Sequence, residues 1–123
     1  MIVKLLKDHI VKQSTTFGEL RETFIGDECP FLNIAVADNI EPTKAHFHRE
    51  FDGIYFVLDG YVGLKLNDPK SDRIWTEYLG ANELCVISKG VHHEVTEASD
   101  TSKLCVISVP QFHSGDETLS DNI

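Results

Sequence analysis

From residue 31 onward, turn signals divide the sequence into short segments rich in β-branched and aromatic residues. Segments of this kind form strands, and glycine, proline, asparagine and aspartate gather in the turns between them. Parallel βαβ units would need helical stretches between the strands, so the pattern predicts an all-β sandwich or barrel. The eight expected strands span residues 31–37, 44–48, 53–59, 61–66, 73–79, 84–88, 92–98 and 103–109.

Asp59-Gly60 separates two of these segments and predicts a type I′ hairpin, because this turn requires positive φ. The first thirty residues are less regular. Thr16 followed by Glu19 resembles a capping box that opens a short helix over 17–24, although the same stretch also fits an edge strand. With 123 residues we expect one domain. Its expected parts are an N-terminal arm packed on the barrel (1–30), the barrel (31–117) and a C-terminal tail (118–123).

The charge balance bears on partners and location. Eleven Lys and Arg stand against twenty Asp and Glu, a net charge of -9, and the basic residues form no patch. A nucleic acid would be repelled, so we expect none as a partner. Lys4, Lys7, Asp8 and His9 interrupt the apolar residues of the first segment. No signal peptide or membrane span is therefore expected, and we expect a cytoplasmic protein that does not bind membranes.

Three cysteines are present, Cys29, Cys85 and Cys105, and no CxxC spacing occurs. Neither a disulfide framework nor a thiolate zinc site is indicated. Cys85 and Cys105 lie in apolar runs, so we expect buried, unreactive thiols.

Histidines occur in two pairs. His46 and His48 are one residue apart, so a strand would place both side chains on one face. His92 and His93 are adjacent, so only one of them can join the first pair. Three imidazoles on an inward face would suit a divalent transition metal and leave positions open for a substrate. A lone His-x-His pair can also be surface decoration.

At these residues the sequence resembles the small single-domain cupins of the conserved-barrel type. "HFHREFDGIYFVLDG" is similar to their first motif in His46, His48 and Gly60, and "GANELCVISKGVHHEVTE" to their second in Gly80, Gly90 and His93. "VISVPQFHSGDE" is similar to the Pro-x-Phe and Asp-Glu ending of these proteins. The resemblance implies a double-stranded β-helix, or jelly roll, with a metal in the barrel mouth held by the three histidines.

The chain also departs from the family motifs. Gly53 stands where the motif has glutamate, Ser88 where it has proline and Glu97 where it has asparagine. Losing the glutamate leaves a neutral three-histidine set, which resembles the thiol and diketone dioxygenases among the cupins. The resemblance thus implies Fe(II), with Zn, Ni or Mn as alternatives. A bulge could bring Asp52 or Glu50 into the vacant place. Alternatively, Asp52 is a turn residue bonded to its own backbone, or the site holds no metal.

Other residues have narrower predicted roles. Tyr55 would shape the cavity wall, and His92 or Asp52 would move protons. Trp75 and Tyr78 would fill the sandwich. Because "GIYFVLD" and "LCVIS" are apolar on both faces, we expect a homodimer to cover one face.

The predicted function is metal-dependent chemistry on a small polar or acidic molecule, with dioxygenation as its most specific form. The alternatives are a sugar or sugar-phosphate isomerase or epimerase, and a non-catalytic module that binds a small ligand. Fold alone cannot choose among them.

Overall fold

A computed structural model describes residues 10–15, 18–23, 30–111 and 115–123, the first two ranges as backbone only. The described chain is all-β and contains no helix that could cross a bilayer. Eleven strands follow one another: β1 (Ile10–Thr15), β2 (Gly18–Thr23), β3 (Asn33–Asp38), β4 (His46–Phe47), β5 (Asp52–Asp59), β6 (Tyr61–Asp68), β7 (Arg73–Gly80), β8 (Leu84–Ile87), β9 (His92–Ala98), β10 (Lys103–Val109) and β11 (Thr118–Leu119).

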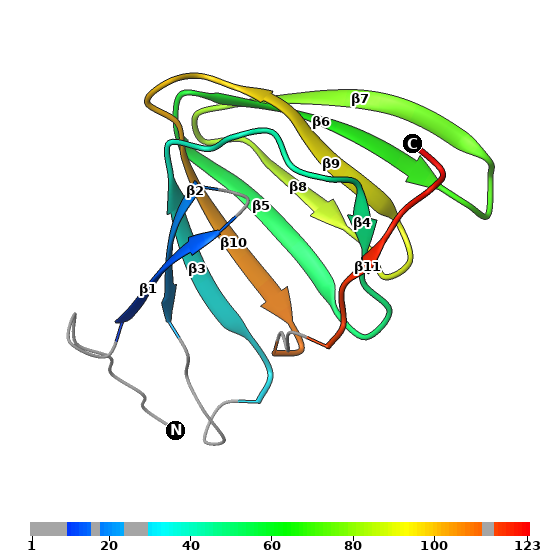
Figure 1. The fold of residues 1–123 in the computed structure, drawn as a ribbon, viewed down its shortest axis with the longest axis horizontal. Coiled ribbons are helices and arrows are strands. Elements are labelled where there is room, and N and C mark those ends of the chain that lie inside the picture. Colours follow the sequence, from blue (N-terminus) through cyan, green and yellow to red (C-terminus); the bar gives the residue numbers. More distant parts are fainter. Residues whose placement is uncertain (1–9, 16–17, 24–29, 112–114) are drawn as a thin grey trace.

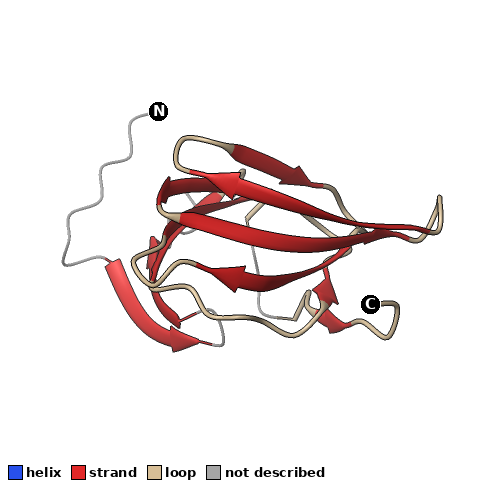
Figure 2. Ribbon diagram, turned by 90° about the horizontal axis from the view of Figure 1, so that it is seen from above, coloured by secondary structure: helices blue, strands red, loops and turns tan. Residues whose placement is uncertain are grey.

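The strands form two antiparallel sheets that face each other (Figures 1 and 2). The six-stranded sheet has the order β1-β2-β3-β10-β5-β8, and the five-stranded sheet has the order β11-β4-β9-β6-β7. From β3 to β10 the chain passes from one sheet to the other at every step except the β6–β7 hairpin. This alternation is that of a jelly roll, so the predicted all-β class and jelly-roll architecture are confirmed. Each of the eight predicted strands is present, and the second is shortened to β4.

The helix expected over 17–24 is wrong, and the strand alternative is confirmed, although the strand, β2, lies between β1 and β3 rather than at the sheet edge. β1 and β2 form an antiparallel hairpin, and β2 continues the six-stranded sheet along β3, with Glu19 opposite Asp38. A capping box is a local preference of small energy. Backbone hydrogen bonding to the free edge of β3 overrides it.

Asp59-Gly60 does not make the predicted hairpin. β5 and β6, which it joins, lie in different sheets. Gly60 has the expected positive φ of 75°, but Asp59 does not share it, so the turn is not type I′. A side chain at Gly60 would meet Ser99 and Ser102. A short turn of this composition therefore serves equally well for a tight crossing between sheets.

The core lies between the two sheets and consists of aliphatic side chains around Tyr55. Trp75 packs on its edge, but Tyr78 is 62% exposed, so the prediction that Tyr78 fills the sandwich is wrong.

Cys85 and Cys105 are half-buried free thiols rather than buried ones, and burial raises the pKa of both. Cys29, His9 and His113 lie outside the described residues. The buried core cluster comprises Ala37, Ile40, Tyr55, Val57, Val62, Leu64, Leu66, Leu79, Ile87, Val95 and Leu104.

Candidate metal site

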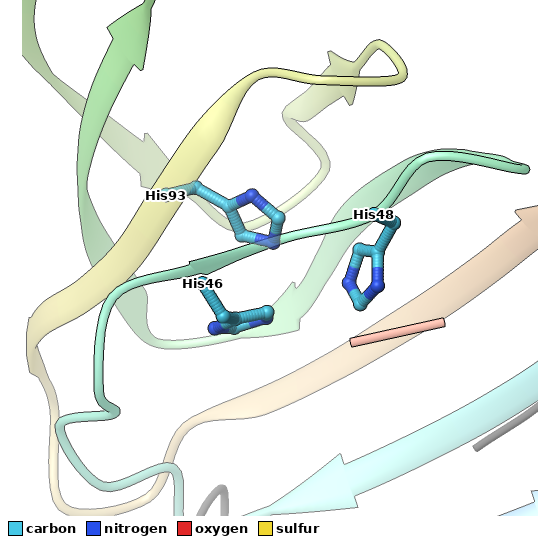
Figure 3. Close-up of side chains that lie close together, drawn as sticks. All are labelled: His46, His48 and His93. Atoms are coloured by element: carbon cyan, nitrogen blue, oxygen red, sulfur yellow. The ribbon is translucent and has the colours of Figure 1, made fainter. Parts of the chain in front are cut away.

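The three histidines that the sequence singled out lie together. β4 pairs with β9 so that His46 stands directly opposite His93, and His48 follows β4. One ring nitrogen from each residue can be chosen so that all three lie within 4.8 Å of one another. Figure 3 shows the three rings gathered in one place, two from the β4 segment and one from β9. The cluster can hold a metal ion.

The three rings contact one another at an angle rather than in parallel stacks. Ring centroids are 4.3 Å apart for His46 and His93, 5.1 Å for His46 and His48, and 5.5 Å for His48 and His93. Tyr55 of β5 meets His93 edge to face at 5.9 Å, and Phe51 packs on His48 at 4.3 Å. The cluster therefore has an aromatic wall, with Tyr55 at the place predicted for it.

Each of the three rings is oriented by the main chain. The Nδ1 atom of His46 lies 2.8 Å from the Lys44 carbonyl oxygen, and that of His93 lies 3.0 Å from the Val91 carbonyl. For His48 the partner is the carbonyl of Asp116, at 2.5 Å. A carbonyl oxygen only accepts, so each Nδ1 carries the hydrogen and each Nε2 keeps its lone pair. Metal-binding histidines are commonly fixed in this way.

Burial keeps two of the three rings, those of His48 and His93, in the form that binds metal. Burial is the main cause that lowers the pKa of His48. The hydrogen bond to the Asp116 carbonyl raises this pKa, and the neighbouring His46 lowers it. Burial and then His46 lower the pKa of His93 to about 3, although the hydrogen bond to the Val91 carbonyl acts to raise it. Because only a neutral imidazole has a lone pair to give, these surroundings favour coordination over protonation. The donor set thus fits a divalent transition metal.

Gly53 has no side chain at the position where the cupin motif has glutamate, and Asp52 does not take the place of that carboxylate. Asp52 accepts a hydrogen bond from the Lys89 amide through Oδ1, at 2.9 Å. Glu50 is exposed. Neither residue belongs to the cluster found among the described residues. The alternative that Asp52 is a turn residue bonded to its own backbone is also wrong, because Asp52 begins β5 and its carboxylate accepts from an amide of another loop.

His92 lies on the opposite side of β9 from His93, as expected for adjacent strand residues. Its ring stacks on Phe47 with a centroid distance of 4.1 Å and an angle of 11°, and its Nδ1 bonds the Ser120 hydroxyl. This placement gives no support to a role for His92 in moving protons at the cluster.

Two residues that sequence reasoning did not assign lie at the site. Asp116 accepts hydrogen bonds from the Arg49 and Glu50 amides, both at 2.8 Å. Glu117 reaches His46, with 3.7 Å between its Oε1 and the histidine Nε2. The signal in the sequence was the Asp-Glu ending of the cupin resemblance, which carried no role because those residues lie nearly seventy positions after the His-x-His pair.

A separate cavity of about 430 Å³ lies between β7 and β8. Trp75, Glu77, Leu84 and Val86 are among its lining residues, and none of the three histidines is. One of its lining residues, Leu66, pairs with His93 across β6 and β9.

Comparison with known proteins gives similarity at the level of structure alone. No protein-family model matches the sequence, and no curated protein matches it. Among solved structures, a variant of Streptomyces PAC13 with uridine superposes at a TM-score of 0.74 and 15% identity, covering 98% of this chain and 92% of that one. Another structure of that protein describes it as a nucleoside dehydratase.

Two further structures extend the comparison. A protein from Planctomyces limnophilus has a TM-score of 0.74 and 21% identity, with 95% of this chain and 96% of that one covered. Oxalate decarboxylase from Bacillus subtilis has a TM-score of 0.79 and 13% identity, and the match covers 92% of this chain but 30% of the enzyme. These likenesses establish the fold, which is the cupin jelly roll.

Proposed function

We propose that this protein binds a divalent transition metal through His46, His48 and His93 and uses it to act on a small polar or acidic molecule. The observation that carries the proposal is the shared orientation of the three rings. Every Nδ1 is hydrogen-bonded to a main-chain carbonyl, so all three rings have the tautomer in which Nε2 carries a lone pair, and the rings lie in one buried or half-buried cluster. A structural histidine needs no such arrangement, and three together are what a metal site requires.

Fe(II) is the ion that we propose, with Zn, Ni and Mn as alternatives, because imidazole nitrogen serves all four. The bound ion would act as a Lewis acid and hold the substrate beside its reaction partner. Tyr55 would supply the wall. Burial, the charge of Glu117 and the neighbouring Cys85 raise its pKa, so its hydroxyl keeps the proton and can donate a hydrogen bond.

Metal content tests the site directly. We expect wild-type protein to bind one Fe(II) or Co(II) per chain and His48→Ala to lose most of this binding, as measured by calorimetry and elemental analysis. His92→Asn is the matched control, since His92 faces away from the cluster, and it should retain the metal. Equal metal binding by His48→Ala and wild type would refute the proposal.

Dioxygenation is the specific reaction that we propose. Iron-loaded protein should consume oxygen in the presence of a small carboxylate, thiol or diketone from a substrate panel, measured with an oxygen electrode. Turnover of sugars without oxygen uptake would instead identify the isomerase or epimerase hypothesis. Ligand binding that survives both chelation and His48→Ala would identify the non-catalytic module.

We also propose that the protein is a homodimer, formed through the outer face of the six-stranded sheet. Outward residues of β3, β10, β5 and β8 stand side by side in register and make two unbroken apolar rows. Leu84 and Val86 at the β8 edge are 54% and 57% exposed. An exposed apolar face of this kind can be covered by its own copy in a two-fold dimer. The rows are Ile34-Ile107-Ile54-Val86 and Val36-Cys105-Phe56-Leu84.

A further inference from the structure

We propose that Glu117 supplies the carboxylate ligand that the Gly53 position lacks, so that the metal is held by three imidazoles and one carboxylate from the C-terminal segment. This inference rests on the proposed metal site. It differs from the expected arrangement, in which the carboxylate would come from β5.

The distance between Glu117 and His46 is that of neighbouring ligands. Glu117 Oε1 lies 3.7 Å from His46 Nε2, the ring nitrogen that carries no hydrogen when Nδ1 donates to the Lys44 carbonyl. Two donors about 2.1 Å from one ion are roughly 3.0 to 3.4 Å apart, depending on geometry. A movement of a few tenths of an ångström would bring the pair to that spacing. The Glu117 side chain is 44% exposed, so it has room to make it.

The charge of Glu117 is felt by other members of the site. Burial is the main cause that lowers the pKa of His48, and the Glu117 carboxylate acts against it. The same carboxylate adds to the effect of burial in raising the pKa of Tyr55. The carboxylate charge of Glu117 thus acts on the site, while its direct contact with the three-histidine group is the one with His46.

The backbone around Glu117 is held beside β4, the strand that carries His46. β11 pairs with β4, with Thr118 opposite Phe47, and the Ser120 amide donates to the Ala45 carbonyl at 2.9 Å. On the other side of Glu117, Asp116 binds two amides of the loop after His48. Glu117 lies between these two attachments, so its Cα is positioned on both sides.

The other carboxylates near the site have different tasks. Both oxygens of Asp116 accept backbone amides, and Asp52 holds the Lys89 amide. Glu117 remains as the carboxylate that can approach the ion. It would lower the formal charge of a divalent centre from two to one, and a hard oxygen donor beside three imidazoles suits Fe(II) or Mn(II).

The test compares Glu117→Gln with Asp121→Asn, which removes one charge from the same segment. We expect Co(II) affinity, measured by calorimetry, to fall at least tenfold in Glu117→Gln and to change less than twofold in Asp121→Asn. The visible absorption spectrum of bound Co(II) should also change in Glu117→Gln, because one ligand is replaced. Circular dichroism would verify that both variants are folded.

The possible outcomes separate this inference from the proposed function. If wild type binds Co(II), His48→Ala does not, and Glu117→Gln matches wild type in affinity and spectrum, then Glu117 is not a ligand and the three-histidine site stands alone. If both charge variants lose the same affinity, general electrostatics explains the loss and the inference is overturned. If wild type binds no metal, the proposed function and this inference fail together.

Discussion

The protonation state of single side chains decides what the cluster can do. His93 is 2% exposed and lies against two other imidazoles, so a charge on its ring would be neither solvated nor compensated. Burial therefore holds the pKa of His93 far below that of a free imidazole, and it lowers the pKa of His48 as well. A metal at the proposed site would bind these two rings without first displacing a proton.

The His93 pKa makes stability depend on pH. The unfolded chain protonates this ring near pH 6.5, whereas the native metal-free protein does so only near pH 3. Between these values the unfolded state binds more protons, so the unfolding free energy falls as pH falls, by up to about 1.4 kcal/mol per pH unit. Above pH 6.5 the contribution is complete and constant.

Urea unfolding of chelator-treated protein between pH 7.5 and 5 would measure this dependence. His93→Gln carries no titrating ring, so its curve should be flatter than that of wild type over the same range. Parallel curves would show that His93 is not the residue responsible.

Gly53 offers a gain-of-function prediction. A Cβ built there meets only the Ile87 carbonyl oxygen, at 4.0 Å, and the backbone does not have positive φ. Gly53→Glu should therefore be accommodated and should restore the family's carboxylate. In the Glu117→Gln background we expect it to recover most of the lost Co(II) affinity. Gly53→Gln in the same background, which has the same size without the charge, should recover none.

At the scale of elements, the C-terminal segment contributes most to the site. β11 pairs with β4, and the carboxylate and carbonyl of Asp116 hold the loop that carries His48. Asn122 extends the attachment through a side-chain hydrogen bond to Asn67 of β6. The ligand strand β4 has only two residues, so its position depends on these neighbours.

Removing the Asp116 carboxylate tests this dependence. Asp116→Ala leaves two amides without their charged acceptor, and we expect the unfolding free energy to fall by about 2 to 4 kcal/mol. Metal affinity should fall as well, since the loop after His48 loses two attachments, although the Asp116 carbonyl that accepts from His48 is retained. Asp121→Ala in the same segment should change stability by less than about 0.5 kcal/mol. Urea unfolding and calorimetry would give both values, and similar losses in the two variants would contradict the assignment.

The same elements show how far sequence reasoning reaches. Strands β3 to β10 follow from the spacing of apolar segments and turns, and the grouping of His46, His48 and His93 follows from strand periodicity and the cupin motifs. The β5–β6 crossing and the β1–β2 hairpin do not, because each depends on which sheet edge is available. Glu117 escaped prediction for the same reason, since its approach to His46 depends on tertiary pairing of β11 with β4.

At the scale of the whole molecule, the two sheets use their faces differently. The inner faces meet in the core, and β4 and β9 of the five-stranded sheet carry the histidines. The outer face of the six-stranded sheet carries the two apolar rows, which a second copy would cover. A stable interface buries roughly 800 Å² on each partner.

The dimer has a direct test. Val86→Lys places a charge at the exposed β8 end of the proposed interface, and we expect light scattering after size exclusion to show a change from twice the mass of one chain to once that mass. Ile74→Lys alters an apolar residue of similar exposure on β7, in the other sheet, and should leave the dimer intact. A wild-type protein that elutes as a single chain would refute the proposal.

The attachment of residues 116–122 to β4 has a consequence for biosynthesis. When His93 leaves the ribosome, all three imidazoles are already present in the nascent chain, but the residues that orient His48 have not yet been made. Capture of the proposed ion would therefore be a late event. A polypeptide released before residue 116 would contain every histidine of the centre and would still lack the means to hold them in place.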